Sequence, residues 1–168
     1  MGRRELRARV DCVWTMSGMP FCTFDDSLWP LLMVRVVGEP SNQRFEEYLD
    51  ASASFLHRGE PYVIVSDLLQ VGMVSAELRR RQAEWTTQHD GLMRETLLGN
   101  AFVLDSPFFR LGLNIVLHLK SPSWPYVIVP RMEPAFAWAA GRLEEAGLHE
   151  PAERVRRHFG LLPVRQPG

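Results

Sequence analysis

The sequence is short of the residues and motifs that mark several large classes of protein. Its two cysteines, Cys12 and Cys22, form neither the framework of a disulfide-rich domain nor the paired spacing of a zinc site. No apolar run is long enough for a transmembrane helix. P-loop, G-x-G-x-x-G, G-x-S-x-G and H-E-x-x-H motifs are all missing, so we expect no cofactor, no metal and no catalytic residues.

Lysine is also nearly absent, and the positive charge is unevenly spread. Lys120 is the single lysine, and the formal net charge is −1. Four arginines oppose two acidic residues within 1–20, and the same balance holds within 150–168, which leaves an acidic body. Because nucleic-acid binding needs a basic stripe, we expect no nucleic-acid partner. With no secretory signal or membrane segment recognisable, the expected location is the cytoplasm.

What is present is the composition of an ordinary globular domain. The chain has 168 residues, of which 46% are hydrophobic and 23% are charged, enough for one core. We expect a flexible basic arm over 1–19, one folded domain over 20–147, and a short basic helix with a tail over 148–168.

Apolar segments of two kinds alternate along the chain. Short, continuous runs predict strands, and runs with apolar residues three and four apart predict helices. Two strands joined by a short turn must pair antiparallel, whereas the later strands, separated by helices, favour parallel pairing. The prediction is a single α/β domain with a mixed, mostly parallel sheet opened by an antiparallel hairpin, in the order ββαβαβαβα. The expected strands are Phe21–Phe24, Leu31–Val37, Tyr62–Val65, Ala101–Leu104 and Tyr126–Val129.

Two of the expected helices carry residues whose placement matters later. In the helix over 108–119, Phe108, Leu111 and Ile115 recur at helical spacing and predict its core-facing side. In the helix that opens at Glu133, Trp138 falls off the apolar stripe, so we expect an exposed aromatic anchor for a partner or a second subunit. An exposed edge strand also makes a homodimer plausible.

The order of these elements resembles the STAS fold of anti-sigma-factor antagonists, and more specifically the SpoIIAA-like group of bacterial proteins. The resemblance covers about residues 20–147. It rests on five segments in order: Leu31–Gly38, Pro61–Asp67, Arg81 with Glu84-Trp85, Gly99–Val103, and Glu133–Trp138 ahead of Leu143.

The resemblance implies a cytoplasmic, non-enzymatic module for protein interaction or regulation. In the antagonist branch, a serine at the start of the helix after the second long strand is phosphorylated. Ser75 occupies a comparable place here, although the segment from Asp67 to Ser75 departs from the compact Asp-Ser-Ser-Gly pattern of that branch. A helix N-terminus stabilises a phosphate, but the simpler interpretation of Ser75, and the one we favour, is a plain N-cap.

The candidate partner-binding or regulatory residues are therefore Ser75, Arg79, Arg81, Asp67 and Trp138. The alternative for Arg79 and Arg81 is a solvated helix face, partly neutralised by nearby glutamates. Arg35 interrupts an apolar strand, so it either emerges at the sheet edge or pairs with a carboxylate such as Asp67.

Two other functions remain open. The SpoIIAA-like group also resembles lipid-transfer proteins of the CRAL-TRIO kind, which implies a carrier of a small apolar or lipid-like ligand between helices and sheet. The other open function is a metal-dependent enzyme. Asp67 and Asp105 both end apolar strands, and open α/β sheets place their ligand-binding crevices at such strand ends. Two carboxylates there could bind a metal ion. Strand-end aspartates are as readily caps of the following turn or helix.

Overall fold

The computed structural model describes residues 21–161, apart from the side chain of Leu119. The expected arm over 1–19 and the end of the tail lie outside these residues. Within the described part, strands and helices alternate in the predicted order. They are β1 (Cys22–Asp25), β2 (Leu31–Gly38), α1 (Asn42–Leu56), β3 (Tyr62–Val71), α2 (Ala76–Thr96), β4 (Leu97–Val103), α3 (Pro107–Leu119), β5 (Tyr126–Val129), α4 (Met132–Glu145) and α5 (His149–His158).

The strands form one five-stranded sheet in the order β1-β2-β3-β4-β5. Strand β1 pairs antiparallel with β2, and every later neighbour pairs in parallel. This confirms the predicted mixed α/β architecture. Strand β3 runs beyond the apolar segment that predicts it, because Ser66 and Asp67 continue the parallel ladder opposite Val34 and Arg35 of β2.

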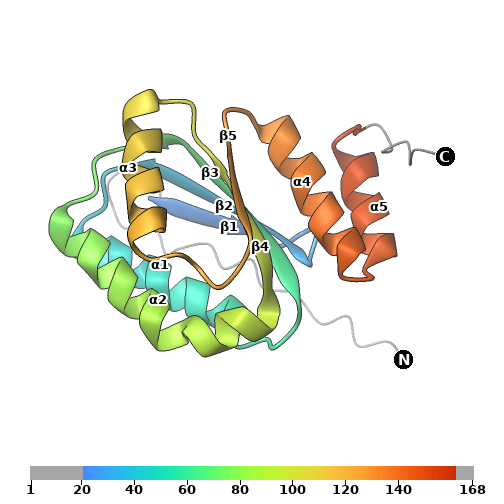
Figure 1. Cartoon of the computed structure of the whole chain (residues 1–168), viewed down its shortest axis with the longest axis horizontal. Coiled ribbons are helices and arrows are strands. Elements are labelled where there is room, and N and C mark those ends of the chain that lie inside the picture. The colour runs from blue at the N-terminus through green and yellow to red at the C-terminus, as the bar shows by residue number, and fades with distance from the viewer. Residues whose placement is uncertain (1–20, 162–168) are drawn as a thin grey trace.

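The helices lie in two layers, one on each face of the sheet. Crossovers between parallel strands are right-handed, and the strands follow one another in one direction across the sheet, so α1, α2 and α3 all fall on the same face. Figure 1 shows these three helices on one side of the strands and α4 with α5 on the other. The last two helices therefore cover the face that the crossovers leave bare.

The side chains of β3 alternate between these two layers, as the pleat requires. Val63 and Val65 pack into the core beneath α4 and α5, while Tyr62 and Ile64 pack into the core beneath α1 and α2. These side chains are shielded from water at the centre of the sheet: Val63 and Val65 are fully buried and Tyr62 is 2% exposed. The domain thus has two hydrophobic cores separated by one sheet.

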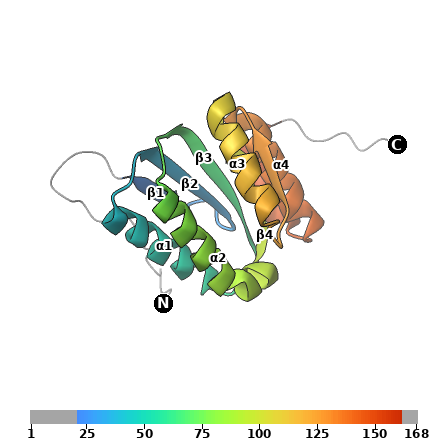
Figure 2. The same ribbon diagram turned by 60° about the vertical axis from the view of Figure 1, so that its left-hand side comes forward.

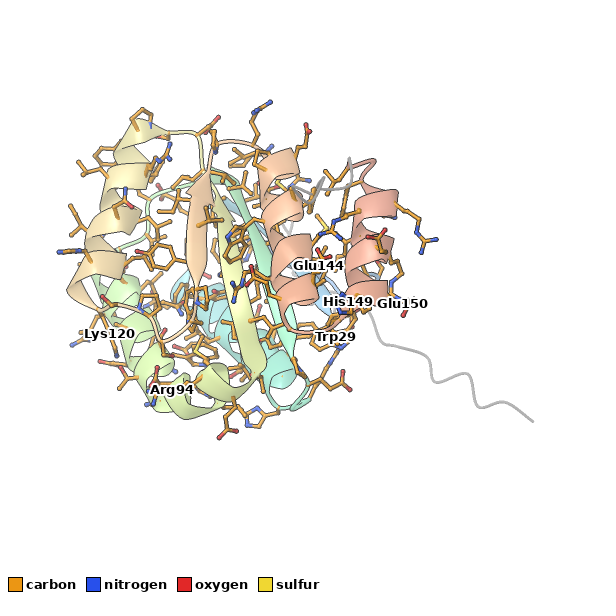
Figure 3. All side chains as sticks on the ribbon, turned by 45° about the vertical axis from the view of Figure 1, so that its right-hand side comes forward. Trp29, Arg94, Lys120, Glu144, His149 and Glu150 are labelled. Atoms are coloured by element: carbon orange, nitrogen blue, oxygen red, sulfur yellow. The ribbon has the colours of Figure 1, made fainter. Side chains whose placement is uncertain are left out.

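The turn between β1 and β2 is held by polar contacts around Trp29. The Arg58 guanidinium lies 4.5 Å from the centroid of the Trp29 ring and donates to Asp26 at 2.7 Å. The Trp29 indole N–H donates to Glu60 at 2.6 Å. From the other layer, Arg154 donates to the Trp29 carbonyl at 2.7 Å, and Figure 3 shows Trp29 beside the start of α5. These contacts join the hairpin to the loop after α1 and to α5.

Helices α4 and α5 are joined by a buried arginine. Arg156 of α5 is 7% exposed, and it donates to Glu144 of α4 and to Glu153 on its own helix. The rings of Phe136 and Phe159 stack nearby with centroids 3.5 Å apart. The short basic helix expected after residue 148 is thus α5, packed against α4.

Gly99 marks a close approach between β4 and α4. A Cβ at this position would lie 2.5 Å from Cη2 of Trp138 and 2.9 Å from the Pro125 carbonyl oxygen. The Trp138 ring therefore covers the glycine, and a larger residue would displace it.

We expect Gly99→Ala to destabilise the fold by about 1–3 kcal/mol, the usual cost of overpacking. Thermal unfolding of the variant measures this. Adding Trp138→Leu to Gly99→Ala should restore part of the loss. Gly91→Ala is the matched control, since nothing lies within 4 Å of its added methyl and alanine favours the helix. Equal unfolding temperatures for Gly99→Ala and the wild type would contradict the contact.

The pair between Glu144 and Arg156 makes stability depend on pH. The hydrogen bond from Arg156, reinforced by its charge, lowers the pKa of Glu144 below its ordinary value. A lowered carboxyl pKa adds stability that is fully present above the unfolded-state value of about 4.3 and is lost as the pH falls through the folded-state value. The unfolding temperature of the wild type should fall as the pH is lowered from neutral to below about 4.3, the ordinary pKa of a glutamate. We expect this fall to be smaller in Glu144→Gln, which lacks the titrating carboxylate.

The control for this comparison is Glu95→Gln, which removes an exposed carboxylate of α2. Its unfolding temperature should follow that of the wild type across the same pH range. If Glu144→Gln also follows the wild type into acid, the pair makes no pH-dependent contribution.

Candidate functional site

Ser75 lies where the sequence places it, at the start of α2. Its backbone is extended and its hydroxyl oxygen accepts a hydrogen bond from the Leu78 amide at 3.2 Å, so the residue is the N-cap of the helix. The side chain is at the surface. The capping contact gives Ser75 a structural role. Phosphorylation of Ser75 remains a prediction.

The two predicted arginines beside it are both engaged in contacts within the domain. Arg79 donates to the Val74 carbonyl at 2.9 Å. Arg81 makes a two-pronged ion pair with Glu46 of α1, at 2.7 and 3.0 Å, and these hydrogen bonds raise the pKa of its guanidinium. Arg81 therefore connects α1 to α2, and it is not directed at solvent as a free cation.

Asp67 pairs with Arg35, which decides between the two alternatives for that arginine. The carboxylate lies 3.1 Å from Nε of Arg35 and also accepts from the Leu69 amide at 3.2 Å. Asp105 follows β4 and is exposed. Among residues 21–161, no three histidine, cysteine or acidic side chains are grouped closely enough to hold a metal ion.

Trp138 is half-buried, whereas the sequence predicts an exposed anchor. Its ring packs over Gly99 and borders the core beneath α4, and the Arg142 guanidinium lies 5.9 Å from its centroid. It is half-buried although it lies off the apolar stripe of its helix, because Gly99 opposite it on β4 leaves room for an indole.

Helix α3 carries the feature that the sequence interpretation places wrongly. Phe108, Leu111 and Ile115, predicted to face the core, are 68%, 61% and 51% exposed. Val116 beside them is also exposed. Instead, Leu117 is buried, and Phe109 and Leu113, which share its side of the helix, are half-buried. We call Phe108, Leu111, Ile115 and Val116 the outer face of α3.

The outer face escaped the sequence interpretation because α3 is apolar on two sides. Phe109, Leu113 and Leu117 recur four apart and form a second stripe, which is the one turned toward the protein. A surface helix packs one side against the protein, so a helix with two apolar stripes leaves one of them exposed to solvent. The presence of both stripes in Pro107–Leu119 is the sequence feature that could have indicated this exposure.

Few polar contacts hold α3 and the loop after it to the rest of the domain. Arg110 donates to the Ile128 carbonyl of β5 at 3.4 Å. After the helix, Lys120 donates to the hydroxyl of Thr87, and Ser123 donates to Asp90 of α2 at 2.9 Å. The pKa of Asp90 is lowered, mainly by the hydrogen bond from Ser123 and further by Arg94. Figure 2 shows α3 at the end of the helix layer, beyond α2.

Comparison with known proteins identifies the fold and nothing narrower. No protein-family model matches the chain, and no curated protein sequence matches it. Among solved structures, the chain is similar to an uncharacterized protein of the DUF3478 family with a SpoIIAA-like fold, from Shewanella loihica PV-4. The two share 12% sequence identity with a TM-score of 0.55, over 70% of this chain and 91% of that chain.

The chain therefore has a SpoIIAA-like fold, which confirms the resemblance drawn from the order of its segments. At 12% identity the likeness extends to the fold alone. In addition, none of the helices within residues 21–161 has the length and apolar character needed to cross a membrane.

The capping role of Ser75 gives a direct test on stability. We expect Ser75→Ala to destabilise the domain by about 1 kcal/mol and Ser75→Asp to preserve most of the stability, because an aspartate also caps. Denaturant unfolding measures both. Ser41→Ala is the positive control: Ser41 caps α1 through the Arg44 amide, so its removal should cost a similar amount. An unchanged midpoint for Ser75→Ala would contradict the capping role.

Proposed function

We propose that this SpoIIAA-like domain is a non-enzymatic regulatory module that acts by docking to a partner, and that the outer face of α3 is its docking surface. The observation that carries the proposal is the exposure of Phe108, Leu111, Ile115 and Val116 on one helix. Soluble domains rarely expose contiguous apolar surface unless it meets something.

The alternative surface around Ser75 offers less to a partner. Arg81 is held by Glu46, and Arg79 is bonded to a backbone carbonyl. A partner that used Arg81 would first have to break its ion pair with Glu46. The outer face of α3 is apolar, so docking there removes side chains from water without breaking an internal hydrogen bond.

A second candidate, the carrier of a small apolar ligand, is favoured by the partial exposure of apolar side chains between α3 and the sheet. Phe109 and Leu113 on the inner side of the helix are only half-buried. On the sheet, Phe102 and Ile128 are likewise half-buried, and the ring of Trp124 lies 6.3 Å from that of Phe102. These side chains would line such a ligand between α3 and β4–β5.

Site-specific photo-cross-linking in the source cells tests the docking surface. A photoreactive residue replaces Leu111 in one variant and Arg79 in another, with Met73 as the control because it is an exposed apolar residue outside α3. We expect adducts from position 111 and none from 79 or 73. The mass of the adduct identifies a protein, a lipid or a small ligand.

Adducts from position 79 without any from 111 would assign docking to the surface around Ser75. No adduct from any of the three positions would contradict the docking function itself.

A further inference from the structure

We propose that the partner of the outer face of α3 is an anionic lipid membrane, on which the helix lies in the plane of the interface. This inference rests on the proposed docking function and names the chemistry of its partner. Three properties of the helix and its surroundings support it: the side chains of the outer face, the length of the helix, and the charges around it.

The outer face has side chains suited to lipid. Phe108, Leu111, Ile115 and Val116 carry no hydrogen-bonding group, whereas a protein–protein interface contains about one hydrogen bond per 100–200 Å². All four side chains are exposed, and they lie on a helix at the end of its layer. Acyl chains accommodate such side chains without requiring polar partners.

The length of α3 fits a helix that lies along the interface. Its 13 residues span about 20 Å at 1.5 Å per residue, less than the roughly 30 Å hydrocarbon core of a bilayer. Asn114 and His118, which are exposed, follow one flank of the outer face. A helix with this division of apolar and polar sides places its apolar face among the acyl chains and its polar flank among the headgroups.

The charged residues of the segment that contains α3 are all basic. From Ser106 to Met132 the sequence contains no acidic residue, although the whole chain carries a net −1. The same segment holds Arg110, Lys120 and Arg131, all exposed. Arg110 and Lys120 donate to the Ile128 carbonyl and the Thr87 hydroxyl, but these acceptors carry no charge, so neither contact neutralises the cation. Arg110 lies on α3, Lys120 at its C-terminal end and Arg131 just after β5. Anionic lipid attracts cations placed in this way beside an inserted helix.

The carboxylates closest in sequence or contact do not cancel this pattern. Asp90 of α2 approaches the Lys120 end but already accepts hydrogen bonds from Arg94 and Ser123. Asp105 precedes the helix, and Glu133 follows Arg131 and lies in the first turn of α4. The acidic residues therefore border the segment and do not enter it.

The same charges disfavour two other occupants. A second copy docked face to face would bring its own Arg110 and Lys120 against those of the first copy, because a twofold interface pairs identical patches. Residues 1–20 of the chain carry four arginines against Glu5 and Asp11, so their charge has the same sign as that around α3. An anionic surface is the complementary partner.

Vesicle co-sedimentation with the purified full-length protein tests the proposal. The probes are vesicles of phosphatidylcholine alone and vesicles of phosphatidylcholine mixed equally with phosphatidylglycerol. We expect binding to the anionic vesicles, weakened by added salt, and little binding to the neutral ones.

Two variants separate the apolar contribution from the charge contribution. Leu111→Gln with Ile115→Gln should weaken binding at least about tenfold. Arg110→Gln with Lys120→Gln should weaken it roughly fivefold for each cation removed. Met73→Gln and Arg80→Gln are the matched controls, since both residues are exposed outside α3, and they should bind as the wild type does. All the altered residues are exposed, and circular dichroism checks that each variant is folded.

Failure of the wild type to bind anionic vesicles would overturn the membrane proposal, as would equal binding by the Leu111→Gln/Ile115→Gln variant. These outcomes leave the docking function to be judged separately by the cross-linking experiment. A protein adduct from position 111, together with absent vesicle binding, would keep α3 as the docking surface and assign it a protein partner.

Discussion

The handedness of the connections between parallel strands governs where every helix of this domain lies. Each crossover from β2 to β5 moves one strand further in the same direction, and a right-handed crossover then places α1, α2 and α3 on one face. The opposite face, lined by Val63, Val65, Ala101 and Val103, would remain in water. Helices α4 and α5 cover it, which explains why the buried Arg156 and the stacked Phe136 and Phe159 gather there.

The same constraint places α3 at the end of its layer. Helix α1 is tied to α2 by the pair between Glu46 and Arg81, whereas α3 follows the last parallel pair and has α2 on one side only. The strand it leads to, β5, is four residues long, so the sheet beneath it is narrow. An end helix over a short edge strand can bury one stripe, and the second apolar stripe of α3 then faces outward.

Most of the architecture was predictable because it depends on local periodicity. The apolar runs and helical spacings predict the order of elements, and the short turn before Leu31 predicts the antiparallel hairpin. The facing of α3 was not predictable in this way, because two stripes satisfy helical periodicity and tertiary position selects between them. Likewise, the contact of Trp138 with Gly99 and the pair of Arg81 with Glu46 join residues distant in sequence, which no local pattern records.

The predicted regulatory serine and the outer face of α3 share one edge of the sheet. In a parallel sheet every crossover helix begins near the carboxyl end of the strand before it, so Ser75 at the start of α2 and Phe108 at the start of α3 lie toward the same edge. A phosphate on Ser75 would bring negative charge to that edge of the sheet. Phosphorylation of Ser75 and docking of α3 remain separate predictions, but both concern the edge of the sheet at which the crossover helices begin.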